Sequence, residues 1–270
     1  MTLFPKRPMA NLFQTVLITP ILNLLMFFYY GLNTLGIPYA FGFAIMLLTA
    51  SIRLLTSPLI HAQMHSAHKM SKLKPHLDEL SKKHKDDKEQ LSKEQMRLYK
   101  EAGVNPLGGC LPLLFQLPIF IALFQVFSRT LGGGNGQGAL DVLNKSLYVP
   151  WLKVSGLDLT FFGLSLTVKP SQWQSEGFLL LVIPVVTALL QFVQTKQMMV
   201  HTVSKPKKEG QEEDTATAVQ KQMAFVSPFM FGMISYSFPI GLALYWNIFT
   251  VFGILQQYFF NKKQDGTKNN

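Results

Sequence analysis

Long apolar runs, separated by segments that carry most of the charge, constrain this chain more than any other feature. A helix that crosses the hydrocarbon core of a bilayer needs about 20 predominantly apolar residues. The whole chain is 48% hydrophobic and 15% charged, whereas soluble domains carry about a quarter charged residues. We therefore predict an all-α integral membrane protein with five transmembrane helices, at residues 38–60, 105–128, 176–199, 222–237 and 241–260.

The N-terminal segment, residues 1–37, is ambiguous. Residues 10–32 are apolar enough to span a bilayer, but they include Gln14, Pro20 and Asn23. We interpret them as an amphipathic helix that lies in the membrane–water interface on the outer side of the bilayer, with its aromatic residues near the headgroups. The alternative is a sixth span.

Residues 61–104 change character abruptly, with ten Lys or Arg and seven Asp or Glu. Apolar residues nevertheless recur there at helical spacing, and the polar stretch 83–88 interrupts them. The pattern predicts a cytoplasmic helical hairpin with a narrow apolar contact seam, formed by Met70, Leu73, Leu77, Leu80 and Leu91.

The distribution of basic residues predicts the topology. Residues 61–104, 200–221 and the tail 261–270 together carry seventeen Lys or Arg, whereas the loop 129–175 carries four. The positive-inside rule then places the N-terminus outside and the C-terminus in the cytoplasm, with Lys6 and Arg7 as the opposing signal. Because topology and anionic lipid explain the basic loops, we expect no direct DNA binding.

Arg53 is the one charged residue in the first predicted span. It lies roughly 10 Å inside the hydrocarbon edge if the rise is about 1.5 Å per residue, and a central arginine costs about 2.5–3.5 kcal/mol on insertion scales. One explanation is that its side chain snorkels to the interface. The other is a wet cavity inside the bundle.

Polar side chains in the spans favour the cavity. Apart from Glu176, which borders the third span, the proposed spans contain no Asp or Glu, but they contain Thr49, Gln116, Gln191 and Asn247. Such residues commonly bridge membrane helices. Together with Arg53 they would instead line a hydrophilic groove open to the cytoplasm, able to attract an acidic or polar segment of another molecule.

The same composition argues against an enzyme or a metal protein. Proton-coupled transporters and aspartyl proteases need acidic residues in their spans, and the motifs HExxH and GxSxG are missing from the sequence. His61, His65 and His68 have a spacing that suits a metal, but their lysine-rich surroundings favour a solvated face. We expect no cofactor and no metal.

Three blocks, in this order, carry a resemblance to a known family. They are "LLTASIRLLTSPL" (47–59), "KDDKEQLSKEQMRLYKEAGVNPLGGCLPLLFQLPIFIALF" (85–124) and "SFPIGLALYWNIFTVFGILQQYFF" (237–260). The chain resembles the YidC family of membrane protein insertases, within the Oxa-type superfamily, in a short form without a large extracytoplasmic domain.

The resemblance implies a function and a site. Five core helices would enclose the groove, Arg53 is similar to the family's groove arginine, and Thr49, Gln116, Phe120 and Trp246 match positions along the substrate path. The implied partners are nascent membrane proteins, lipid, and in some members the Sec translocon and the ribosome. We expect a bacterial inner-membrane protein that acts as a monomer.

Two other functions compete with insertion. A chaperone would assist Sec-dependent folding and assembly without inserting anything itself, and the sequence does not separate it from an insertase. A channel or transporter would need polar residues that reach the outer leaflet. The second span ends "IFIALFQVF", almost wholly apolar, which disfavours it.

Overall fold

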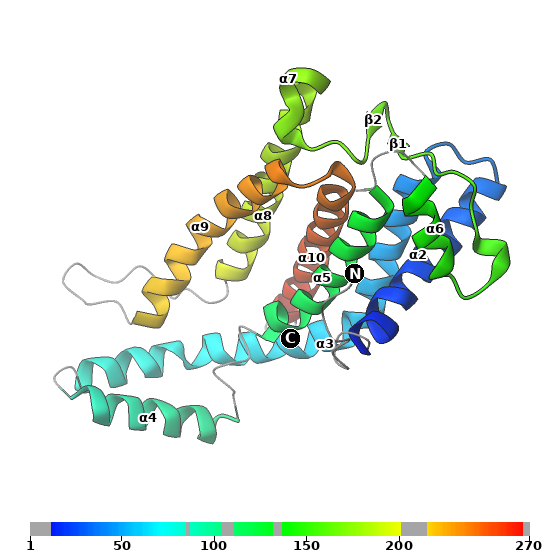
Figure 1. The fold of residues 1–270 in the computed structure, drawn as a ribbon. Coiled ribbons are helices and arrows are strands. Elements are labelled where there is room, and N and C mark those ends of the chain that lie inside the picture. Colours follow the sequence, from blue (N-terminus) through cyan, green and yellow to red (C-terminus); the bar gives the residue numbers. More distant parts are fainter. Residues whose placement is uncertain (1–11, 85–86, 104–110, 132–136, 201–214, 267–270) are drawn as a thin grey trace, which may run out of the picture. The chain divides into compact units, whose positions relative to one another are not determined.

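The fold is known from a computed structural model, which describes residues 12–84, 87–103, 111–131, 137–200 and 215–266 (Figure 1). It is all-helical apart from one small β-hairpin, which confirms the predicted fold class. The longer helices are α2 (Thr19–Thr34, preceded by the π-helix η1, Gln14–Ile18), α3 (Ala40–Lys83), α4 (Lys88–Glu101), α5 (Leu111–Leu131), α6 (Gln137–Lys145), α8 (Val182–Val200), α9 (Thr215–Ser237) and α10 (Ile240–Gly266).

By length and composition, four helices of the described chain can cross a membrane. They are Gln14–Thr34, Ala40–Leu73, Phe178–Met198 and Ile240–Lys263, and two shorter apolar helices cover Gln116–Phe127 and Ala224–Ser237. The first of these is the ambiguous N-terminal segment, so its helix is long enough for either of the two interpretations. Part of the second predicted span, 105–110, lies outside the described residues.

The chain forms two compact units. Unit 1 contains Met1–Leu54, Phe115–Thr187 and Gly232–Phe249, and unit 2 contains the remaining stretches, Leu55–Leu114, Ala188–Phe231 and Thr250–Asn270. The buried core of unit 1 is made by α2, the first part of α3, the second part of α5 and the first part of α10.

A Schellman turn joins α2 to α3. The backbone N–H of Gly36 donates to the carbonyl of Asn33 (3.0 Å), and the N–H of Ile37 donates to that of Leu32 (3.1 Å). Gly36 has a φ of 70°, a left-handed conformation that glycine adopts without steric cost. The turn reverses the chain within a few residues, and Tyr29 then packs edge-on against Phe41 (5.8 Å between ring centroids).

Helix α3 is 44 residues long, about 66 Å at 1.5 Å per residue. It contains both the first predicted span and the first helix of the predicted hairpin, so the change from apolar to charged sequence near residue 60 is not a helix boundary. Pro58 and Pro75 lie inside it, and each removes one backbone hydrogen bond of the helix.

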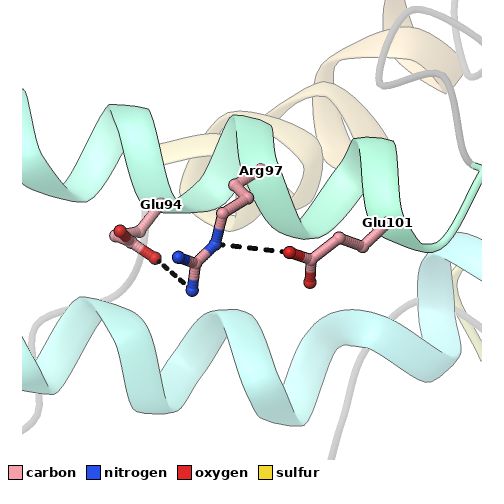
Figure 2. Close-up of polar contacts among 3 residues, drawn as sticks. All are labelled: Glu94, Arg97 and Glu101. Carbon is pink, nitrogen blue, oxygen red and sulfur yellow. Dashed lines mark ion pairs between the residues drawn. The ribbon is translucent and has the colours of Figure 1, made fainter.

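Helix α4 runs beside the second part of α3 within unit 2 (Figures 1 and 2). Its first turn is capped by Asp87, whose carboxylate accepts from the N–H of Gln90 (2.9 Å). On its surface Arg97 bridges Glu94 (2.8 Å) and Glu101 (3.4 Å) (Figure 2). Such exposed ion pairs contribute little stability. Their main effect is to make the surface of α4 hydrophilic.

Within the stretch 129–175, the described residues from 137 onward are more ordered than the sequence indicated. After α6 they form the 3₁₀ turn η3 (Pro150–Leu152) and the antiparallel strands β1 (Thr160–Phe161) and β2 (Leu164–Ser165). Three short helical turns follow, η4 (Pro170–Gln172), α7 (Trp173–Glu176) and η5 (Phe178–Leu181). The carbonyls of Leu166 and Val168 accept from the first N–H groups of α10, at Gly241 and Ile240 (2.9 Å each), and so satisfy donors that a helix start leaves unpaired.

Asn23 fastens this loop segment to α2. Its side-chain amide donates to the carbonyls of Thr19 (2.8 Å) and Ser146 (3.1 Å), and its oxygen accepts from the N–H of Tyr148 (2.7 Å). Asn23 lies on the side of α2 that also carries the exposed Phe27 and Tyr30, yet its own exposed fraction is only 6% because the loop segment covers it. The polar residue that cast doubt on a span thus holds two parts of unit 1 together.

Gly42, in the first turn of α3, marks a close approach between helix and β-hairpin. A Cβ atom there would lie 2.0 Å from the Phe161 ring. That ring is itself packed against Tyr39 (6.2 Å) and Phe43 (5.5 Å). Only a residue without a side chain fits.

We expect Gly42→Ala to lower the free energy of unfolding by about 1–3 kcal/mol, the usual cost of overpacking. Thermal unfolding of the purified protein measures it. Gly31→Ala is the matched control, because its Cβ would meet nothing within 4 Å and alanine favours a helix by about 0.5–1 kcal/mol. Adding Phe161→Ala should reduce the loss of stability that Gly42→Ala causes. Equal stability of Gly42→Ala and Gly31→Ala would refute the steric account.

Candidate functional site

Arg53 packs inside unit 1. Its exposed fraction is 4%, whereas its neighbours Leu54 and Leu55 are 71% and 82% exposed. The guanidinium donates to the backbone carbonyl of Phe249 on α10, and its Cζ lies 3.4 Å from the centroid of the Phe249 ring. The Arg53 side chain is therefore directed at α10. A side chain that snorkels to the interface would be more exposed than this, so its burial argues against the snorkelling explanation.

Gln116 and Phe120 bring α5 to the same part of α10. The Gln116 amide donates to the hydroxyl of Tyr245 (2.7 Å), and Tyr245 is fully buried. One turn further along α5, Phe120 packs edge-on against Trp246, with ring centroids 5.6 Å apart. Two helices thus meet through one polar pair and one aromatic pair.

Thr49 and Asn247 complete the predicted set within unit 1. Thr49 is fully buried, and its hydroxyl donates to the carbonyl of Ile45 in its own helix (2.7 Å). The side-chain oxygen of Asn247 is buried and accepts no hydrogen bond within the described part of the chain. It is an acceptor that an incoming N–H group would satisfy.

The other predicted residues lie in unit 2. Gln191 is on the part of α8 that belongs to that unit, half-buried. Of the hairpin residues, Leu77 is buried, and Met70, Leu73, Leu80 and Leu91 are half-buried. The structure thus places Arg53, Thr49, Gln116, Phe120, Trp246 and Asn247 in one unit, and Gln191 and the hairpin residues in the other.

The three histidines of α3 have an aromatic neighbour in unit 2. The rings of His61, His65 and His68 lie 6.4, 4.9 and 6.4 Å from the ring of Phe260 on α10. In the described residues no group of three or more His, Cys, Asp or Glu is arranged to hold a metal ion.

The sequence analysis missed Tyr245 and Phe249. Both lie in the block 237–260, where aromatic residues in an apolar run look like ordinary core. Their spacing was the available signal: 245 and 249 are one helical turn apart and share a face. The rings of the two residues are 5.9 Å apart, and each receives a hydrogen bond from a different helix, one at its hydroxyl and one at its carbonyl.

The chemistry of this arrangement is that of binding. It combines a buried cation, an amide and a hydroxyl as polar contacts, and an unsatisfied carbonyl oxygen at Asn247. A charge in low-dielectric surroundings interacts strongly with a polar or acidic group that approaches it. The fold and this site define a multi-pass membrane protein with polar residues inside its helices.

Comparison with known proteins identifies the family. The model of the family described as "60Kd inner membrane protein" matches residues 32–268. The chain therefore belongs to the 60Kd inner membrane protein family, which includes the YidC proteins, and the resemblance inferred from its sequence is confirmed.

Relatives are found in bacteria and in chloroplasts. "Membrane protein insertase YidC" of Fusobacterium nucleatum is 33% identical over 83% of this chain and 87% of its own length. "Inner membrane ALBINO3-like protein 1, chloroplastic" of Chlamydomonas reinhardtii is 31% identical over 86% of this chain and 46% of its own. The chain spans about half the length of several relatives that it matches.

A solved structure has a similar fold. It is described as "Active YidC insertase crystal structure with the first transmembrane domain resolved", and it matches with a TM-score of 0.56 and 26% sequence identity. The match covers 94% of this chain and 47% of the other.

The Gln116–Tyr245 hydrogen bond yields a testable energy. In a double-mutant cycle of Gln116→Leu and Tyr245→Phe, we expect a coupling of about 0.6 kcal/mol and at most about 1.7 kcal/mol, as for other interhelical hydrogen bonds in membranes. Unfolding of the purified protein measures each corner of the cycle. Gln116→Leu combined with Tyr30→Phe is the control and should be additive, because the Tyr30 ring contacts Trp151. Additivity in the Gln116–Tyr245 cycle would contradict the bond.

Proposed function

We propose that this protein is a membrane protein insertase. It receives nascent membrane proteins from the cytoplasm and moves their short hydrophilic tails across the bilayer along a polar groove that contains Arg53. The single observation that carries the proposal is Arg53 itself, which lies in the apolar part of α3, is only 4% exposed and packs against Phe249 of α10. Membership of the family, and the relative in Fusobacterium that matches over most of both chains, support it.

The groove lowers the cost of moving polar groups into the membrane. A polar group transferred from water without a partner costs several kcal/mol, about 2–7 by most reference scales. Contacts with the Arg53 guanidinium and the Asn247 oxygen offset part of that cost for a tail, and an acidic tail gains most from the arginine. Neither a nucleotide nor a metal takes part in this step.

The apolar part of a client follows a different route. It slides past the aromatic residues Phe120 and Trp246 and leaves into lipid, driven by about 25 cal/mol per Å² of apolar surface removed from water. The hairpin of α3 and α4 meets the client first at the cytoplasmic face. Its seam of half-buried side chains, with Leu77 as the buried one, leaves apolar surface for transient contacts.

The proposal includes an orientation and partners. The N-terminus lies outside and the C-terminus in the cytoplasm, as the basic loops indicate. The membrane potential, positive outside, then helps to draw an acidic tail outward. The protein acts as a monomer, and the Sec translocon and the ribosome contact it on the cytoplasmic side or within the membrane.

The test is insertion of a short acidic-tailed client into proteoliposomes that contain only this protein. We expect Arg53→Ala to abolish most insertion, and Arg53→Lys to retain part of it, because lysine keeps the charge but loses the planar contact with the Phe249 ring. Protection of the client's tail from added protease measures insertion. A client with an uncharged tail should depend less on the residue at position 53.

Lys169→Ala is the matched control, since it removes an exposed cation that lies outside the hairpin and outside the predicted groove. It should insert clients as the wild type does. Equal insertion by wild type and Arg53→Ala for every acidic-tailed client would refute the role of the charge. Failure of the wild type itself would refute autonomous insertion and favour the chaperone.

A further inference from the structure

Four exposed aromatic side chains form a patch where α2 meets the segment after α6. They are Phe27, Tyr30, Tyr148 and Trp151, with exposed fractions of 53%, 40%, 62% and 49%. Trp151 joins the two elements, because its ring lies 5.0 Å from that of Tyr30 and 6.4 Å from that of Phe27, edge-on to both. We call these four residues the aromatic patch.

The patch is held in place by polar contacts behind it. Asn23 lies one turn before Phe27, on the same face of α2, and it binds the backbone of Ser146 and Tyr148. Asn144 closes the segment further, since its amide donates to the carbonyl of Val154 (2.9 Å) and its oxygen accepts from the N–H of Val154 (3.1 Å). The aromatic side chains are thus presented on a fixed backbone.

The surroundings of the patch match the boundary of a membrane. On one side it continues into the exposed apolar face of η1 and α2, which carries Val16 of η1 (59% exposed) and Leu24 of α2 (36%). In a multi-pass membrane protein such a face is in contact with lipid. On the other side the exposed lysines Lys145 and Lys153 flank Tyr148 and Trp151 in the sequence.

Tryptophan and tyrosine are the residues that concentrate at the headgroup level, because one part of the ring is apolar and another is polar. Lysines beside them suit the phosphate groups of lipid headgroups. Apolar side chains, aromatic rings and lysines are the groups suited, respectively, to the acyl chains, the headgroup level and the phosphates of a bilayer. A water-facing loop does not need this combination, and exposed aromatic clusters on proteins generally mark a binding surface.

We propose that the aromatic patch is a lipid-binding surface that anchors the segment after α6, residues 144–154, in the headgroup region of the bilayer. Its ligand is the phospholipid interface, with the rings at the level of the upper acyl chains and the lysines at the phosphates. The anchor is independent of the groove, and its test does not rely on insertion activity.

The test uses Trp151 as a fluorescent probe in the full-length protein. Trp173→Phe and Trp246→Phe leave it as the only tryptophan, and the protein is reconstituted in phosphatidylcholine–phosphatidylglycerol vesicles. We expect loss of emission when the lipids carry bromine near the headgroup end of the acyl chain, a smaller loss with bromine near the methyl end, and little quenching by aqueous iodide.

Met96→Trp, with all three native tryptophans replaced, is the matched control. Met96 is 47% exposed, almost the same as Trp151, but it lies on the charged helix α4. We expect iodide to quench this probe and brominated lipid to spare it. Circular dichroism confirms the helical fold of each variant, and Trp246→Tyr replaces Trp246→Phe if the latter unfolds.

Three results would overturn the proposal. Iodide quenching of Trp151 without lipid quenching would show that the patch faces water. Emission that becomes sensitive to brominated lipid only on dilution of the protein in the membrane would show that a second copy covers it. Loss of lipid quenching on addition of a client would show that the patch binds clients instead of lipid.

Discussion

A lipid environment offers no water to polar atoms, so a polar atom inside the helices of this protein is costly unless another group binds it. Unit 1 is organised by that constraint. Arg53 reaches the carbonyl of Phe249, Gln116 reaches the hydroxyl of Tyr245, and Asn23 reaches the backbone of the segment after α6. Each of these contacts joins two elements that are distant in sequence. The polar residues therefore specify which apolar surfaces meet. Apolar contacts alone are not directional, so they would specify the pairing of these helices less well.

The burial of Arg53 is a balance of comparable terms. On insertion scales an arginine at the centre of a membrane helix costs about 2.5–3.5 kcal/mol. A desolvated cation–π contact stabilises it by about 2 kcal/mol. A hydrogen bond from a charged donor adds about 1.5–3 kcal/mol. The arginine is thus kept in the bundle at little net cost. Because the net free-energy cost of burying Arg53 is small, its guanidinium can remain charged inside the bundle and can interact with a polar group that enters beside it.

The all-helical fold class followed from the length of the apolar runs, because lipid thickness sets the length of a span. Local detail was harder to predict. The boundary expected near residue 60 is absent, since composition can change along one helix without ending it. The order within 137–175 depends on contacts such as Asn23 with Ser146, which no local pattern reveals. Tyr245 and Phe249 were not predicted because, within an apolar run, an aromatic residue that contacts the site residues cannot be distinguished from one that only packs in the core.

The Asn23 contacts also have a consequence for how the protein is made. The partners of this amide, at residues 146 and 148, lie 123 and 125 positions further along the chain. At a synthesis rate of about 5–20 residues per second, those partners emerge roughly 6–25 s later. Helices α2 and α3, joined by their short turn, are complete during this interval while Asn23 is still exposed. The contacts that join α2 to the segment after α6 can therefore form only after α2 and α3 have been synthesised.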